Sequence, residues 1–71
     1  MRRTELIRQA KREAKRQGLR FELVEERGSH EMWRAGQVMV FLPRHAVELS
    51  AGVERDVKVR LEREFGKDWW R

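Results

Sequence analysis

The chain contains only two histidines, His30 and His45, and each stands where an expected strand meets a turn. His30 directly follows Gly28-Ser29, and His45 follows Pro43-Arg44. There is no Cys and no Tyr. Histidine is the residue type that most readily gives or takes a proton near pH 7. The two imidazoles are therefore the candidate proton-transfer groups of this chain.

Basic and hydroxyl side chains accompany both histidines. In a strongly basic chain the imidazoles point to proton transfer on a polyanion such as a phosphodiester backbone, whose cleavage needs a base for the attacking hydroxyl, an acid for the leaving oxygen, and cations that stabilise the phosphate. We expect His30 to be the catalytic acid–base, Ser29 to position it, and His45 to be a candidate second proton carrier. Structural alternatives exist for each, such as a turn histidine that only bonds backbone. The cations expected at the phosphate near the histidines are Arg27, Arg34 and Arg44.

Positive charge is concentrated at the N-terminal end. The formal net charge is +5, but residues 1–20 carry +6 and the other 51 residues carry −1. Around an expected helix over residues 4–17, Leu6, Ile7, Ala10 and Ala14 share one side. The opposite side is almost purely basic, which indicates either a solvated outer face or a phosphate-binding one. The RNA contacts expected on it are Arg8, Lys11, Arg12 and Lys15.

Hydrophobic periodicity and turn residues predict five elements in a single domain over residues 1–71. A helix capped by Thr4 spans 4–17, three strands span 20–27, 29–34 and 37–42, and a second helix follows Ser50 and ends at Gly66. The short reversals force an antiparallel meander. The fold class is therefore α+β. We expect an α-β-β-β-α two-layer sandwich, with both helices on one face of a three-stranded sheet and a tail over 66–71.

The third strand is apolar on both sides, with Val38, Val40 and Leu42 alternating with Met39 and Phe41. Two helices on one face can cover only one of those sides. The other side needs the tail, a second copy or a partner protein as cover. We interpret the Trp69-Trp70 pair as a hydrophobic cover for the sheet rather than as a base-stacking platform.

The composition excludes several other classes of protein. Without Cys there are no disulfides, which fits a reducing compartment. No apolar run has the length of a signal peptide or a membrane span. Two histidines and scattered acids do not make a metal-ligand set. We expect a soluble cytoplasmic protein that needs no cofactor and no metal; its oligomeric state stays open.

The combination of Gly28-Ser29-His30, a following aromatic at Trp33, the run Val38 to His45 and a closing amphipathic helix resembles the HicA toxins. The resemblance covers about residues 6–65. It implies a double-stranded-RNA-binding-like fold and the activity of an mRNA interferase in a type II toxin–antitoxin system. It also implies that His30 carries metal-independent catalysis, that translation is inhibited through mRNA cleavage, and that a HicB-type antitoxin is the partner.

Two further functions remain open at this point. The chain could be a non-catalytic RNA-binding module of the same fold. The basic first helix favours this alternative, as does Glu31, whose negative charge directly follows His30. It could also be a structural partner protein whose free sheet face binds another chain. RNA cleavage separates the first function from both alternatives, and salt-dependent RNA affinity separates the two alternatives from each other.

Overall fold

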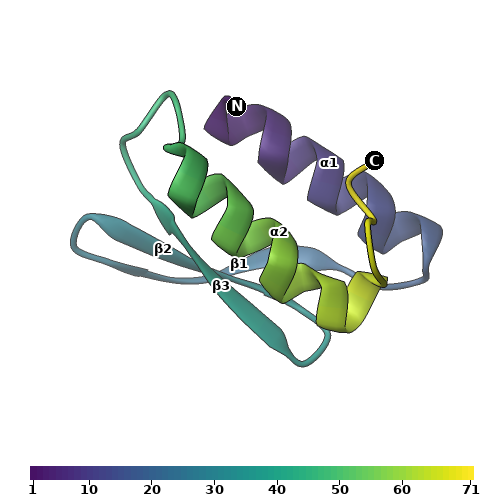
Figure 1. Cartoon of the computed structure of the whole chain (residues 1–71). Coiled ribbons are helices and arrows are strands. Elements are labelled where there is room, and N and C mark those ends of the chain that lie inside the picture. The colour runs from purple at the N-terminus through teal and green to yellow at the C-terminus, as the bar shows by residue number, and fades with distance from the viewer.

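The computed structural model describes all 71 residues and contains the predicted elements in the predicted order (Figure 1). Both helices pack on one face of an antiparallel sheet with strand order β1-β2-β3. The α+β two-layer sandwich is thus confirmed. No helix is both long and apolar enough to cross a bilayer. The bounds are Arg3–Arg16 for α1, Phe21–Arg27 for β1, His30–Ala35 for β2, Val38–Pro43 for β3 and Ala51–Phe65 for α2.

Helix α1 begins one residue before the predicted Thr4 cap, which is therefore wrong. The N-cap is Arg2, whose side chain makes no capping bond. Instead the backbone N–H of Arg3 donates to the carbonyl of Val47 at 3.0 Å, and Arg2 forms an isolated bridge with Glu48. The first turn is held by the segment that precedes α2, which is a long-range contact and not a local cap.

Helix α2 is built as its sequence predicts. The Ser50 hydroxyl accepts the N–H of Val53 at 3.2 Å, as an N-cap should. The apolar residues of α2 follow one another at i+4 spacing, and three residues of this i+4 stripe, Val57, Leu61 and Phe65, are buried against the sheet. They meet Leu6, Ala10 and Ala14 of α1 in one core. The small alanines let α1 approach closely, so the two short helices can share a single sheet face.

Two-residue turns connect the three strands and determine their register. Gly28 and Gly36 each occupy the first turn position with positive φ, +54° and +58°. This is the conformation for which a hairpin turn of this kind selects glycine. The Gly28-Ser29 turn pairs Arg27 with His30. His30 is thereby the first residue of β2, one position later than the predicted strand start at Ser29.

A β-bulge at Val24 changes which side chains of β1 share a face. Leu23 pairs with Trp33 on the helix side, but Glu25 pairs with Met32. In a regular strand Leu23 and Glu25, which are two positions apart, would share a face, and Glu25 would point toward the helices. The bulge places Glu25 and Arg27 on the same face as His30.

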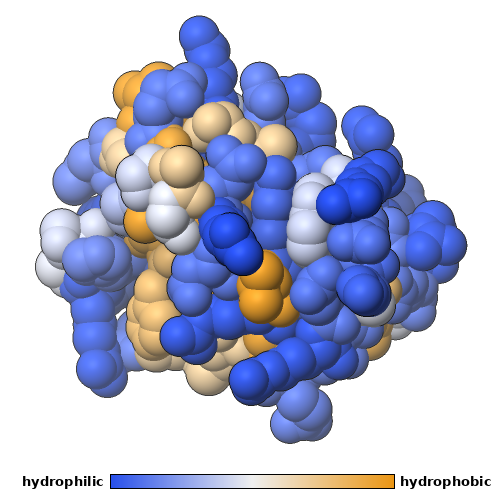
Figure 2. All heavy atoms as spheres, in the orientation of Figure 1, coloured by the Kyte–Doolittle hydropathy of each residue, from blue (hydrophilic) through white to orange (hydrophobic).

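The sheet face away from the helices is uncovered, and the structure identifies which residues line it. Val40 and Leu42 are buried under the helices, whereas Met39 and Phe41 are exposed, Phe41 by 51%. We call the side chains of Met32, Met39 and Phe41 the open face. The Trp69-Trp70 tail does not cover it, contrary to the sequence interpretation. The tail folds back over the helix layer, whose outer surface is mostly hydrophilic (Figures 1 and 2).

Candidate active site and nucleic-acid interface

His30 is exposed at the end of the sheet and held by its neighbours in the hairpin. Its backbone lies between Arg27 of β1 and Pro43 of β3. The Ser29 hydroxyl lies 3.2 Å from His30 Nδ1. This contact can orient the ring and leave Nε2 directed to solvent, which is the geometry of a positioned proton carrier. The structure thus brings together the two residues expected to work as a pair.

A pocket of about 410 Å³ opens beside His30 on the open face. Its floor is apolar, from Met32 and Phe41, and its polar wall is made by Glu25 and Arg27. At the edge of this pocket the imidazole can exchange a proton with a phosphodiester and the neighbouring guanidinium can stabilise its negative charge. The adjacent base or sugar can then pack on the apolar floor. His45 does not line this pocket. It is exposed in the connection between β3 and α2.

Glu31 points away from His30, although the two residues are adjacent in the chain. Side chains of successive strand residues point to opposite faces, and Glu31 is buried under the helices with 6% exposed. Its carboxylate pairs with the Arg3 guanidinium of α1 and accepts the indole N–H of Trp33 at 3.1 Å. The Glu31 charge is thus neutralised inside the helix side of the sheet and does not face a phosphate at His30.

Arg3 is a site-supporting residue that the sequence interpretation missed. Besides Glu31, it binds the carbonyl of Pro43 through Nε at 3.1 Å. Pro43 is the strand partner of His30, and Glu31 is its chain neighbour. Arg3 therefore links the first turn of α1 to the residue that follows His30 in β2 and to the residue that pairs with His30 in β3. The sequence contained one signal for this contact. Strand alternation places Glu31 on the helix side of the sheet, and a carboxylate buried there requires a cationic partner.

The three arginines expected around the histidines each lie against a glutamate. The pairs are Arg27–Glu25 at 3.3 Å, Arg34–Glu22 at 3.5 Å and Arg44–Glu26 at 3.3 Å. All six side chains are at least 40% exposed. Ion pairs of this kind are weak, about 0–1 kcal/mol, so a phosphate can compete for the guanidinium groups. At the His30 end of the sheet, Glu25 and Glu26 offset the charges of Arg27 and Arg44. Arg34 lies four residues further along β2 and does not flank His30, contrary to the expectation from the sequence.

The basic face of α1 is free, unlike the arginines of the sheet. Arg8, Lys11, Arg12 and Lys15 are exposed, and none of them takes part in an ion pair. Two other cations of this helix are paired, Arg3 with Glu31 and Arg16 with Glu13. The contact of Arg16 with Glu13 is the main reason that the pKa of the Glu13 carboxyl is lowered. Four cations without partners on one helix form a surface that matches a polyanion.

The structure does not place all the expected residues together. The basic face belongs to the helix layer, whereas His30 lies on the other side of the sheet at its end. Of the four cations on the basic face, Lys11 approaches the sheet, with Nζ 5.6 Å from the Trp33 ring centre. An RNA bound to α1 must therefore pass around the β1 edge or the end of the hairpin to reach His30.

The chain contains no cluster of three or more His, Cys, Asp or Glu side chains placed to hold a metal ion. Comparisons with protein-family models, curated proteins and solved structures gave no match to this chain. Function is therefore inferred from the chemistry of the side chains and from the resemblance of the motifs.

Proposed function

We propose that this protein is an RNA endonuclease that binds RNA through the basic face of α1 and cleaves it with His30. The observation that carries the proposal is the exposed imidazole, with Ser29 Oγ at 3.2 Å and Arg27 in the same pocket. The motif resemblance adds the biological role of an mRNA interferase, the toxin of a type II toxin–antitoxin pair that inhibits translation. The unpaired cations of α1 account for the affinity.

The cleavage step uses the nucleophile that RNA itself carries. His30 takes the proton from a 2′-hydroxyl, and the 2′-oxygen attacks the adjacent phosphorus. The bond from phosphorus to the 5′-oxygen breaks, and the 5′-oxygen receives its proton from the His30 imidazolium, which restores the neutral imidazole. The products are a 2′,3′-cyclic phosphate and a 5′-hydroxyl end. Arg27 stabilises the charge of the phosphorane as it develops. In this proposal the reaction needs no metal and no cofactor.

Replacing His30 tests the catalytic assignment directly. His30→Ala should reduce cleavage of a fluorescent RNA by about 10²–10⁴-fold, the usual contribution of a general acid–base. Because His30 is exposed, the variant should keep the wild-type thermal midpoint and RNA affinity. His45→Ala is the matched control and should cost less than tenfold, since His45 lies outside the pocket. A folded His30→Ala protein that cleaves at the wild-type rate would refute the mechanism.

One observation favours the alternative of a non-catalytic RNA-binding module. Glu25 and Glu26 pair with Arg27 and Arg44 near His30, whereas the cations of the basic face of α1 are free. In that case wild-type protein binds RNA but produces no 2′,3′-cyclic ends. Mass spectrometry of RNA incubated with purified wild-type protein or with His30→Ala distinguishes the two functions, because cleavage by a contaminating ribonuclease would not depend on His30.

The open face is the proposed docking surface of the antitoxin. Met32, Met39 and Phe41 lie on it next to the His30 pocket, and the tail leaves them uncovered. A protein on this surface would bury Phe41 and close access to His30, which inhibits the toxin by occlusion. Met39→Ser should weaken such a complex and leave cleavage by the free protein intact, because Met39 is exposed on the open face but does not line the His30 pocket. A structure of the complex with His30 open would contradict this mode of inhibition.

A further inference from the structure

The two tryptophans of the tail have different environments, and this difference suggests a second site. Trp69 is a structural residue. Its indole N–H donates to the carbonyl of Lys58 at 2.9 Å, and its ring meets Phe65 edge-on with 5.1 Å between ring centres. These contacts attach the tail to α2 and add Trp69 to the margin of the core.

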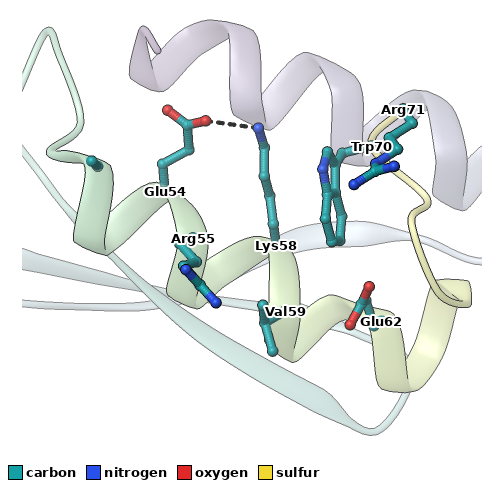
Figure 3. Close-up of a pocket in the computed structure, with 8 residues that line it drawn as sticks. Glu54, Arg55, Lys58, Val59, Glu62, Trp70 and Arg71 are labelled. Atoms are coloured by element: carbon teal, nitrogen blue, oxygen red, sulfur yellow. Dashed lines mark hydrogen bonds and ion pairs between the residues drawn. The ribbon is translucent and has the colours of Figure 1, made fainter.

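Trp70 is held by its backbone, whereas its ring is available. Its carbonyl accepts the side-chain amide of Gln9 on α1 at 2.9 Å, which anchors the tail across the two helices. The half-buried ring meets Trp69 at right angles, and its indole N–H makes no hydrogen bond within the chain. The ring stands at the wall of a pocket of about 450 Å³ on the outer side of α2 (Figure 3).

The charged groups around this ring leave a cation free. Glu54 is occupied by Lys58 at 2.7 Å, and Glu62 accepts the backbone N–H of Asp68 at 2.9 Å. Arg55 makes no ion pair, and Arg71 is held only loosely, 3.7 Å from an oxygen of Asp68. The pocket therefore combines a fixed indole ring with a free guanidinium and a second one that is easily released (Figure 3).

We infer that this pocket is a subsite for one unpaired RNA base, which stacks on Trp70 while Arg55 and Arg71 contact the adjacent phosphate. Stacking of bases on aromatic rings beside a basic surface is the usual way to bind single strands. The pocket continues the proposed RNA surface, because Gln9, which holds Trp70, also lines a hollow with Arg8 and Arg12 of α1. The inference rests on the proposed RNA binding and specifies its substrate as single-stranded at this point.

The test compares a single-stranded RNA decamer with its fully paired duplex, using fluorescence anisotropy at fixed salt. Trp70→Ala should weaken binding of the single strand by about 5- to 150-fold, the measured range for one stacked base. Binding of the duplex should stay within about twofold, because a paired base cannot enter the pocket. Trp70→Phe keeps a ring and should restore most of the affinity. Far-UV circular dichroism verifies that the variants are folded.

Arg55→Gln and Arg63→Gln form a matched pair for the phosphate contact. Both arginines are exposed on α2 without ion pairs, but only Arg55 lines the pocket. Arg55→Gln should weaken the single strand more than Arg63→Gln does. Equal effects of the two, or a Trp70→Ala protein with wild-type affinity for the single strand, would overturn the inference.

A separate variant distinguishes this failure from failure of the proposed function. Replacing Lys11, Arg12 and Lys15 with Gln should weaken single strand and duplex alike. If that triple variant loses affinity and Trp70→Ala does not, RNA binding stands and only the base subsite is wrong. If wild-type protein binds neither RNA, both conclusions are wrong.

Discussion

The buried pair between Arg3 and Glu31 makes the sharpest prediction about stability. Arg3→Met keeps most of the apolar stem but removes the guanidinium, so the Glu31 carboxylate is left under the helices with only the Trp33 indole as donor. The bond from Arg3 Nε to the Pro43 carbonyl is lost as well. An uncompensated buried charge is among the few causes of large destabilisation by one substitution.

The size of the effect follows from the burial of the two side chains. Breaking a fully buried pair costs about 3–5 kcal/mol. The Arg3 side chain is 18% exposed and that of Glu31 8%. Some solvation therefore remains, and we expect a loss of about 2–4 kcal/mol. A domain of this size has a total unfolding free energy of roughly 4–10 kcal/mol. The thermal midpoint should fall by about 8–32 °C, at roughly 4–8 °C per kcal/mol.

Thermal and urea unfolding followed by circular dichroism measure this loss. Arg2→Met is the control, because Arg2 lies next to Arg3 and pairs with Glu48 at 3.9 Å with both side chains about two-thirds exposed. It should cost less than about 0.5 kcal/mol. The double variant Arg3→Met/Glu31→Gln should regain stability, since a neutral amide still accepts the indole N–H. Equal losses for Arg3→Met and Arg2→Met, or no recovery in the double variant, would refute the reasoning.

Four other results are expected. Replacing Lys11, Arg12 and Lys15 with Gln should flatten the dependence of log RNA affinity on log salt by about 2 units, at roughly 0.7–0.9 per phosphate contact, and an unchanged slope would mean that the face is only solvated. Ser29→Ala should lower cleavage less than His30→Ala, because it removes an orienting contact and not the proton carrier; equal losses would give Ser29 a direct role. Gly36→Ala should destabilise the protein more than Gly28→Ala in urea titrations, by about 1–2 kcal/mol compared with about 1 kcal/mol. Both glycines have positive φ, but a Cβ at Gly36 would lie 2.3 Å from Glu64 Cδ and displace the carboxylate that accepts the Gln37 N–H. At Gly28 nothing lies within 4 Å of an added Cβ. The hydrogen bond from Lys58 lowers the pKa of the Glu54 carboxyl below 4.5. The stability that this carboxylate contributes is therefore present above that pH and is lost as pH falls through the folded-state pKa. Glu54→Gln should make the free energy of unfolding fall less steeply at acid pH, and an unchanged slope would contradict this role of Glu54.

Local patterns in the sequence were sufficient for the element order and for the helix layer. The i+4 stripe of α2 and its Ser50 cap depend on neighbours within two turns, and both were predicted correctly. The start of α1 was not, because its first turn is held by Val47 and Glu48, which lie more than forty residues away in the chain. Contacts of that range leave no periodic signal.

The candidate site was only partly predictable, for a related reason. The pairing of Ser29 with His30 is local and was expected. The side of the sheet to which Glu31 points follows from strand alternation. The neutralisation of its charge depends on Arg3, which belongs to another element of the fold. The ion pairs Arg34–Glu22 and Arg44–Glu26 depend on strand register and on the path of the chain after β3. The role of the tail was misjudged because a Trp-Trp pair does not reveal which layer it will meet.

The bulge at Val24 has a consequence for how this surface can diverge. It reverses the facing of every residue that follows it in β1, so that Arg27 and Glu25 join His30, while Phe21 and Leu23, which precede it, stay on the helix side. Deleting Val24 would place Glu25 directly after Leu23, so the ladder would become regular while Leu23, Glu25 and Arg27 keep their present strand partners. A single in-frame codon loss at this position would therefore leave both the core and the charged neighbours of His30 in place, so that β1 can vary in length by one residue without a change in the chemistry around the imidazole.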